Sequence, residues 1–348
     1  MQYAIGIDGG GSKCDAVLVD TSGRIVGWGR GGQIQHLYDT SDAIHQSYLD
    51  ALDGALGDLR GAELWVASPT RRRQRWEERI AQAGEICEIL PVSEQKTSLA
   101  AAGEEWGVVV LAGTGSFVHG RSLDGERRLH FGAMGPVLGD FGSGYEIGLA
   151  GLRAAFASHW TASRETSLAQ VIPAALAVDD LNRIFHLIYM HGMERREIAS
   201  LAQVVNEQAE AGDRIAGDIL RAAADALFGL VQDMVHELDL ADQEFPLVAA
   251  GSVAMRSRIW WERMCERVAE IAPRARPVQP RLMMAVGAAL LALRRMDVEW
   301  TPELWSRLEQ TQGEFLARLE QPVAPAAVAA GVQGEMPVSR EGKWSVGT

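Results

Sequence analysis

Residues 3–19 read YAIGIDGGGSKCDAVLV, two apolar runs on either side of a glycine-rich turn. The runs 3–7 and 14–19 are short and apolar on both faces, which is typical of strands buried on both sides of a sheet. Between them, DGGGS at 8–12 has the chemistry of a tight turn. A second turn and the apolar run that begins at Ile25 follow. The segment therefore predicts a meander of three strands opened by a glycine-rich hairpin.

The same order of elements returns about 105 residues further along the chain. GVVVLA at 107–112 predicts a strand, GTGS at 113–116 a turn, and the runs 117–121 and 128–131 two more strands. A repeated strand–turn–strand unit within 348 residues predicts an α/β fold of two lobes, each with a mixed central sheet. In such a fold we expect the two glycine hairpins to face each other.

The lobes are expected at residues 1–110 and 111–298, with an almost wholly helical insertion at about 145–240. The last helix of the second lobe, at about 283–297, is rich in small residues and is expected to pack back on the N-terminal lobe. A C-terminal helix and a loose tail are expected over 299–348. Further helices and strands are expected at 41–56, 63–67, 72–83, 87–92, 246–250, 257–271 and 301–319.

Composition narrows the classes of partner. With 47% hydrophobic and 23% charged residues, the chain is typical of a globular protein with a full core. A net charge of −13 argues against nucleic acid or an anionic membrane as a partner, so a phosphate site must use backbone amides and a metal ion. The three cysteines are widely spaced and predict neither a metal pair nor a disulfide framework. We find no signal-peptide or membrane-span pattern and expect a cytoplasmic protein.

Both glycine hairpins are candidate phosphate sites. Glycine lets backbone amides approach a ligand closely, and successive amides can form an anion-binding nest. Asp8 ends the first strand and is placed to hold a hydrated Mg²⁺ ion, while Thr114 and Ser116 offer hydroxyls to phosphate oxygens. Each segment taken alone is equally typical of an ordinary hairpin.

Two further segments carry candidate ligand contacts, GPVLGDFGSGY at 135–145 and VAAGSV at 248–253. The first runs into a predicted helix start, and because helix N-termini favour anions we expect 142–144 to face phosphate or sugar oxygens. Asp140 in the same segment is placed to accept hydrogen bonds from a sugar. The second segment suits a nucleotide base or ribose. An ordinary helix cap with loop glycines would produce a similar pattern.

Taken together, the four segments resemble the phosphate and adenosine motifs of the actin/hexokinase/Hsp70 superfamily. More narrowly, residues from about 3 to 295 resemble the BadF/BadG/BcrA/BcrD-type ATPase family, which includes N-acetylglucosamine and glucosamine kinases. The resemblance is carried by GIDGGGSKCDAVLVD, VVVLAGTGS, GPVLGDFGSGYEIG, the AGD at 211–213, LVAAGSV and VGAALLAL. It implies two RNase-H-like (actin-like) lobes with ATP and Mg²⁺ between them, and often a homodimer.

The resemblance also implies roles for single residues, several of which depart from the family pattern. The family's catalytic Asp, about 20 residues before GTGS, corresponds to Glu94, and a sugar-contacting Asn corresponds to Gln35. Phe141 stands where the family has Glu, and Ser68 replaces a strand-end glycine. One added methylene can displace a reacting oxygen by more than an ångström. The two longer side chains suit either a different, smaller substrate or a loss of catalysis, unless both residues merely lie on the surface.

The leading hypothesis is an ATP-dependent phosphotransferase that acts on a hydroxyl of a small amino sugar. Its catalytic residues are Glu94, as general base, and Asp140. The predicted nucleotide-binding residues are Asp8, Gly9, Gly10, Gly11, Ser12, Lys13, Gly113, Thr114, Gly115, Ser116, Gly251 and Ser252. The predicted substrate contacts are Gln35, His36, Gly139, Asp140, Gly142 and Ser143. The alternatives are an ATP-driven activator, for which no cysteine has a suitable spacing, and a catalytically impaired nucleotide-binding regulator.

Overall fold

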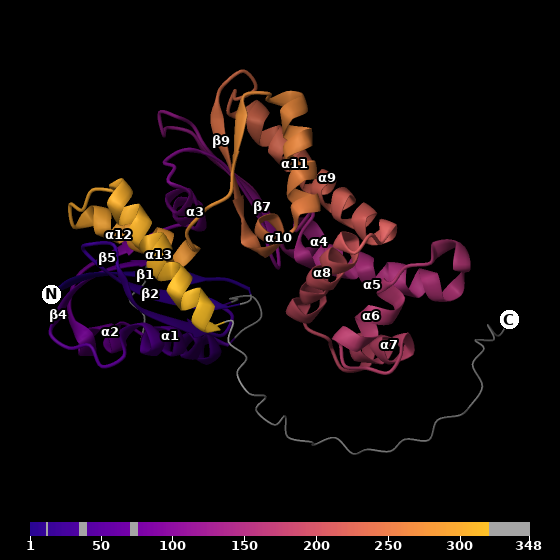
Figure 1. Ribbon diagram of the computed structural model, residues 1–348, viewed down its shortest axis with the longest axis horizontal. Coiled ribbons are helices and arrows are strands. Elements are labelled where there is room, and N and C mark those ends of the chain that lie inside the picture. The colour runs from indigo at the N-terminus through magenta and orange to yellow at the C-terminus, as the bar shows by residue number, and fades with distance from the viewer. Residues whose placement is uncertain (12, 35–39, 70–75, 320–348) are drawn as a thin grey trace, which may run out of the picture.

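The computed structural model describes residues 1–11, 13–34, 40–69 and 76–319 and contains two five-stranded mixed sheets (Figure 1). Strand orders are β3-β2-β1-β4-β5 in the first sheet and β10-β9-β6-β7-β8 in the second. In both, three antiparallel strands that follow one another in sequence are joined by two parallel ones. The repeated hairpin pattern of the sequence is therefore a repeated sheet topology.

The first sheet consists of β1 (Gln2–Gly9), β2 (Cys14–Asp20), β3 (Ile25–Gly31), β4 (Ala62–Ser68) and β5 (Gly84–Pro91). The second consists of β6 (Gly107–Ala112), β7 (Ser116–Arg121), β8 (Arg128–Gly132), β9 (Phe245–Ala250) and β10 (Ala275–Val278). The helices around the first sheet are α1 (Ser41–Leu56), α2 (Glu77–Ala83), α3 (Glu94–Ala102), α12 (Met284–Arg295) and α13 (Pro302–Leu319). The other helices are α4 (Gly135–Leu138), α5 (Gly144–Trp160), the 3-10 turn η1 (Ala162–Arg164), α6 (Leu168–Ala175), α7 (Leu181–Met190), α8 (Arg195–Glu210), α9 (Arg214–Glu237), α10 (Gly251–Arg256) and α11 (Arg258–Ile271).

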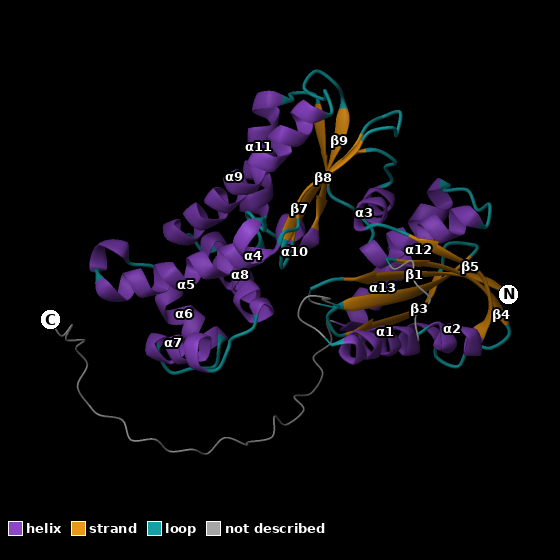
Figure 2. Ribbon diagram, turned by 180° about the vertical axis from the view of Figure 1, so that it is seen from behind, coloured by secondary structure: helices purple, strands orange, loops and turns teal. Residues whose placement is uncertain are grey.

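Helices cover both faces of the first sheet, with α1 on one side and α12 on the other (Figure 2). Alternation along β1 separates the two cores, since Ile5 packs with α1 and Ala4 packs with α12. Gly6 allows the close approach of α12, because a Cβ there would lie 2.0 Å from the carbonyl oxygen of Ala285. The small residues of α12 thus serve tight packing on the N-terminal sheet.

The second sheet packs against a larger helical core. Helix α9 contacts β6, β7 and β8, and α5, α8 and α11 pack around α9. In the views of Figures 1 and 2, α6 and α7 lie beyond α5 and α8, on the side away from the sheet. The helical insertion therefore forms the body of the second lobe. Within the described ranges, none of the helices is both long enough and apolar enough to cross a bilayer.

Helix α3 was not predicted from the sequence, and it connects the two halves of the molecule. It contacts α12 as well as β6 and β9, and Leu99 lies in a cluster with Val109 and Val248 of the second sheet. Most of its residues are buried, polar ones included, so the segment lacks the one-sided apolar stripe that marks a surface helix. Strand β10 was missed as well, because it is four residues long and partly exposed.

The remaining differences concern element ends. Helix α2 begins at Glu77, and the earlier part of the predicted helix at 72–83 falls mostly outside the described residues. The predicted tail after residue 320 lies outside them too. Lobe boundaries near 110 and 298 stay a prediction. Packing assigns α12 and α13 to the first sheet although both follow the second sheet in sequence.

Candidate functional site

The first glycine hairpin is held by the register of β1 and β2. Asp8 pairs with Asp15 and Gly9 with Cys14, and the Gly10 amide closes the turn by donating to the Lys13 carbonyl at 3.0 Å. This register places Asp8 at the end of its strand, beside the turn. Ser12 lies outside the described residues.

Charges around Asp8 are predominantly negative. Burial and the neighbouring Asp15 carboxylate together raise the pKa of Asp8 to about 6, against the opposing effect of Lys13. Lys13 was predicted to bind nucleotide, but its Nζ lies 2.5 Å from Asp15 Oδ2. Asp15 also accepts from Arg30 Nε at 2.7 Å. The cations near this hairpin are therefore engaged by Asp15, and Asp8 is left without a cationic partner of its own among the described residues.

Glu94 is the first residue of α3, where the hydroxyl of Ser93 accepts a hydrogen bond from the Lys96 amide at 3.4 Å and so caps the helix. Glu94 is an exposed residue of this helix. Loss of hydration nevertheless raises the pKa of Glu94 to about 8, and the negative charge of Asp8 contributes to the shift. The two predicted functional carboxylates are thus close enough to interact electrostatically.

The GTGS turn after β6 packs against the third glycine segment. Its Gly113 amide donates to the Gly115 carbonyl at 2.8 Å, and the Ser116 hydroxyl donates to the Phe141 carbonyl at 2.6 Å. A Cβ on Gly115 would lie 2.6 Å from Arg195 Nη2 and about as close to Asp140. Any side chain at this position would have to displace the Arg195 or Asp140 side chain. Ser116 is buried, so its hydroxyl joins the two segments rather than facing solvent.

Asp140 lies beneath this turn, buried and paired with Arg195 of α8. Burial raises the pKa of Asp140, while the Arg195 guanidinium and the Ser116 amide, which donates at 3.5 Å, oppose that shift. Arg195 was not singled out from the sequence, because nothing in the helical pattern indicates which loop the start of α8 meets. The predicted sugar ligand is therefore a carboxylate held in place by a cation from another element.

The amides at the start of α5 are already used within the protein. Gly142 donates to Glu146 Oε2 at 2.6 Å and Gly144 donates to the Gly113 carbonyl at 2.7 Å. Ser143 is fully buried and accepts from the Glu146 amide. The amide of Gly139, also a predicted substrate contact, donates to Gly135. Contacts between this segment and phosphate or sugar stay a prediction, and amide contacts would require these hydrogen bonds to exchange.

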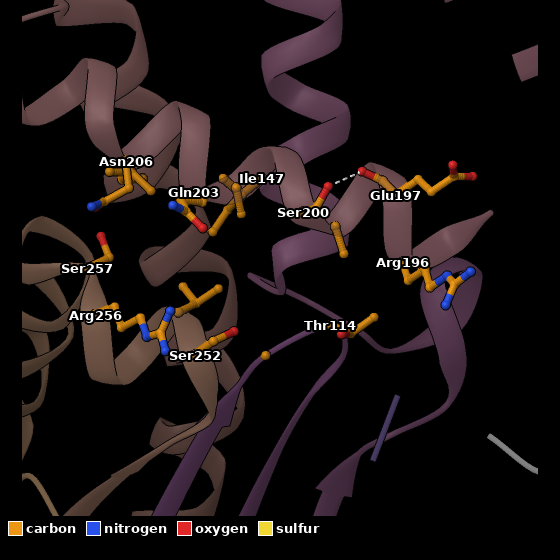
Figure 3. Close-up of a pocket in the computed structure, with 15 residues that line it drawn as sticks. Thr114, Ile147, Arg196, Glu197, Ser200, Gln203, Asn206, Ser252, Arg256 and Ser257 are labelled. Atoms are coloured by element: carbon orange, nitrogen blue, oxygen red, sulfur yellow. Dashed lines mark hydrogen bonds between the residues drawn. The ribbon is translucent and has the colours of Figure 1, made fainter. Parts of the chain in front are cut away.

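A pocket of about 560 Å³ lies between the GTGS turn, α8 and α10 (Figure 3). Its volume falls in the range of small-molecule sites. Of the predicted nucleotide-binding residues, Gly113, Thr114 and Ser252 line it. Gly251 stands behind this wall with a φ of 80°, and a Cβ there would lie 2.4 Å from the Ala112 carbonyl oxygen. The second and fourth glycine segments therefore meet at one pocket.

Much of this pocket was missed from the sequence. The lining residues other than Gly113, Thr114 and Ser252 are Ile147, Arg196, Glu197, Ala199, Ser200, Ala202, Gln203, Asn206, Leu220, Val253, Arg256 and Ser257. Many belong to α8, where polar side chains recur at helical spacing beside the apolar stripe that packs on α5 and α9. This polar stripe was the signal in the sequence that could have indicated a pocket wall. It is equally typical of a helix face exposed to solvent.

The other residues singled out from the sequence lie partly outside the described part of the chain and partly near the ends of β4 and α4. Gln35 and His36 lie outside the described residues. Ser68 is fully buried at the end of β4, and its hydroxyl has no hydrogen-bond partner in the described part of the chain. Phe141 is 40% exposed and shows where the family's acidic side chain would stand. The structure thus groups the candidates into an acidic pair, Asp8 and Glu94, and a set on the second sheet.

Mg²⁺ is compatible with the acidic pair. Both carboxyl groups have raised pKa values, so a divalent cation would favour their ionised forms. No group of three or more His, Cys, Asp or Glu side chains is arranged for a metal within the described ranges. Mg²⁺ commonly binds through one or two carboxylates together with phosphates and water, which is the ligand set that Asp8 can supply in part.

Comparisons with known proteins agree with this architecture. An N-acetylmuramic acid/N-acetylglucosamine kinase from Clostridium acetobutylicum is 28% identical over 308 residues, covering 85% of this chain and 100% of the relative. An N-acetyl-D-glucosamine kinase from Dictyostelium discoideum is 28% identical over 318 residues, covering 83% and 97%. A ROK family glucokinase from Streptomyces griseus, solved with glucose and AMPPNP, has a TM-score of 0.53 at 18% identity over 84% of this chain and 99% of its own.

The likeness to the solved glucokinase confirms the predicted α/β fold of two actin-like, RNase-H-like lobes. The model of the BadF/BadG/BcrA/BcrD ATPase family matches residues 5–292. Because this match spans most of the chain, the protein belongs to the BadF/BadG/BcrA/BcrD ATPase family.

Proposed function

We propose that the protein is an ATP-dependent kinase that phosphorylates a hydroxyl of N-acetylglucosamine or a closely related amino sugar. Family membership and the two kinase relatives support this class of reaction. The observation that carries the proposal is the electrostatic proximity of Glu94 to Asp8. It brings a candidate general base next to the hairpin that is proposed to bind phosphate.

The nucleotide is assigned to the pocket beside α8. Its base and ribose would lie between α8 and the α10 segment, and its phosphates would extend along the GTGS turn toward the hairpin of Asp8. The amides of both hairpins and the hydroxyl of Thr114 are the proposed phosphate donors. Such donors suit a chain with a net charge of −13, because they need no basic surface.

Mg²⁺ is proposed as the cofactor, held by Asp8 through water. The ion would neutralise charge on the transferred phosphoryl group, which is its usual part in this chemistry. No other residue is assigned as a metal ligand.

Glu94 is proposed to accept the proton of the sugar hydroxyl as the hydroxyl oxygen attacks the γ-phosphorus. The bond from the γ-phosphorus to the bridging oxygen of ATP breaks, and ADP leaves. Asp140, held by Arg195, is proposed to orient the sugar through hydrogen bonds from its hydroxyls. Proton transfer by a positioned carboxylate typically contributes about 10² to 10⁴ in rate.

Assembly and location are further proposals. We propose that the kinase works as a cytoplasmic homodimer. The exposed apolar side chains of Phe185, Tyr189 and Met190 on α7 support a protein–protein contact, since apolar side chains that gather at a surface commonly mark interfaces. Light scattering on the purified chain should give the mass of two copies. The mass of one copy at micromolar concentration would contradict the proposed dimer.

The function is tested by measuring ADP release from MgATP with and without a panel of hexoses and amino sugars. Release that depends on N-acetylglucosamine or a related amino sugar is the expected result. Release at the same rate without any sugar would indicate an ATPase instead. Nucleotide binding with no release under any condition would indicate a regulator without turnover.

A further inference from the structure

Helix α8 forms one wall of the nucleotide pocket along its length. Arg196 and Asn206 both line the pocket and are ten residues apart, which is about 15 Å along a helix. Figure 3 shows Thr114 and Arg196 toward one end and Asn206 and Ser257 toward the other. With phosphates at the GTGS turn, a nucleotide laid along this wall has its base near Asn206.

The side chain of Asn206 has one hydrogen-bonding atom without a partner among the described residues. Its Nδ2 donates to Glu210 Oε1 at 3.2 Å, one helical turn further on. This bond orients the amide, since a carboxylate can only accept from the NH₂ group. The opposite atom, Oδ1, is buried and accepts no hydrogen bond from any described residue. A buried acceptor without a donor is uncommon, and in a pocket wall it indicates a ligand that donates.

The pocket also has apolar walls that suit a flat, mainly apolar ring. Ala202, Leu220 and Val253 contribute apolar side chains to the same pocket, and all three are buried in the fold. Such walls can hold either face of a purine but cannot distinguish one purine from another. Discrimination must come from polar groups at the ring edge. Of the polar side-chain atoms of Asn206, Oδ1 is the one without a partner among the described residues, since Nδ2 donates to Glu210.

We infer that Asn206 is a specificity-determining residue that accepts a hydrogen bond from the 6-amino group of adenine and so selects adenine nucleotides. This inference rests on the proposed nucleotide site. Hypoxanthine and guanine carry a carbonyl oxygen at the same ring position. With either base, two acceptors would face each other and the buried Oδ1 would stay without a donor.

The test compares the binding of ADP, IDP and purine riboside 5′-diphosphate to the purified full-length chain by calorimetry. These ligands differ at the 6-position, which carries an amino group, a carbonyl oxygen or hydrogen. The wild-type protein is expected to bind ADP about 10-fold more tightly than either analogue. In Asn206→Leu, the affinity for ADP should fall to that for purine riboside diphosphate, within about 3-fold, because the coupling between residue and amino group is lost.

Gln208→Leu is the matched control, on the same helix but outside the pocket lining, and it should keep the full preference for ADP. Circular dichroism of both variants verifies that α8 is intact. Equal affinity of the wild-type protein for ADP and IDP overturns this inference and leaves the kinase proposal standing. Retention of the full preference for ADP in Asn206→Leu also overturns the inference about Asn206 and leaves the kinase proposal standing. Absence of binding of any nucleotide to the wild-type protein overturns both proposals.

Discussion

At the scale of single residues, the site depends on carboxyl groups with raised pKa values. Loss of hydration raises the pKa of both Asp8 and Glu94, and the negative charge of Asp8 adds to the shift at Glu94. Asp140 is buried too but is opposed by Arg195. The three groups therefore differ in how readily they bind a proton near neutral pH, and Glu94 binds one most readily.

The pH dependence of sugar phosphorylation follows from Glu94. A general base must be ionised, and an acid whose pKa is raised to about 8 becomes fully ionised only above that pH. We expect kcat/KM for the sugar to rise from pH 6 and level off above about pH 8. Glu94→Gln should lower kcat about 100-fold or more while ADP affinity changes little. Glu78→Gln, on the exposed face of α2, is the control. A rate that is flat from pH 6 to 9 would speak against Glu94 as the base.

A second residue-scale prediction concerns stability. Burial and the neighbouring His130 lower the pKa of His119 to about 4, from an ordinary value of 6.5. Between these values the unfolded chain binds a proton that the folded chain does not, so the free energy of unfolding should decrease as pH falls from about 6.5 to 4. Urea unfolding at pH 7 and pH 5 measures this loss. His119→Gln should reduce it, and the exposed His186→Gln should not; identical losses in all three proteins would refute the assignment.

At the scale of elements, the glycine segments pack against one another and against the start of α8. The GTGS turn, the segment before α5 and the start of α8 form one unit, because Gly115 leaves space for the pair of Asp140 and Arg195. The amides at the α5 N-terminus complete this unit by donating to the turn. A substitution in any part of this unit should therefore alter both the affinity for the sugar and the free energy of unfolding.

Removal of Arg195 tests this unit. Arg195→Met leaves a buried carboxylate without its cation and should lower the free energy of unfolding by about 3 kcal/mol at pH 7. KM for the sugar should rise as well, because Asp140 loses its positioning. Arg214→Met removes an exposed pair with Asp218 and should cost about 0.5 kcal/mol or less. Equal losses in urea unfolding for the two variants would show that the Asp140 pair contributes nothing special.

At the scale of the whole molecule, helix α3 and the segment before α12 connect the two halves. Helix α3 carries Glu94 at one end and packs on both α12 and the second sheet. The segment before α12 is fixed by α13, where Gln312 Oε1 accepts from the Met283 amide at 2.7 Å and Nε2 donates to the Arg281 carbonyl at 3.1 Å. Helix α13 lies beyond residues 5–292, which match the family model, and it supports the connection from outside that range.

Gln312→Leu should therefore destabilise the protein by about 1–3 kcal/mol, since the Met283 amide and the Arg281 carbonyl both lose a partner. Thermal and urea unfolding give the value. Gln310→Leu is the control, because Gln310 is exposed and its side-chain amide donates to Glu314 on the same helix. If the two variants unfold alike, α13 does not fix this segment.

The repeated meander was predictable because strand alternation and turn glycines are local signals, as at residues 3–19 and 107–121. Helix α3 was not, because its polar and apolar residues are buried alike. The ion pair of Asp140 and the position of Asn206 in the pocket wall both depend on how α8 packs against turns that are distant in sequence. No local pattern carries that information, so Arg195 and Asn206 emerged only from the structure.

The central claim is that Glu94 activates a sugar hydroxyl beside the phosphate hairpin. Its most direct test is mass spectrometry of N-acetylglucosamine incubated with MgATP and either the wild-type protein or Glu94→Gln. We predict that the sugar gains one phosphoryl group with the wild-type protein and remains almost unmodified with the variant, although both proteins bind ADP. Equal phosphorylation by the two proteins, or none by the wild-type protein with any amino sugar tried, would contradict it.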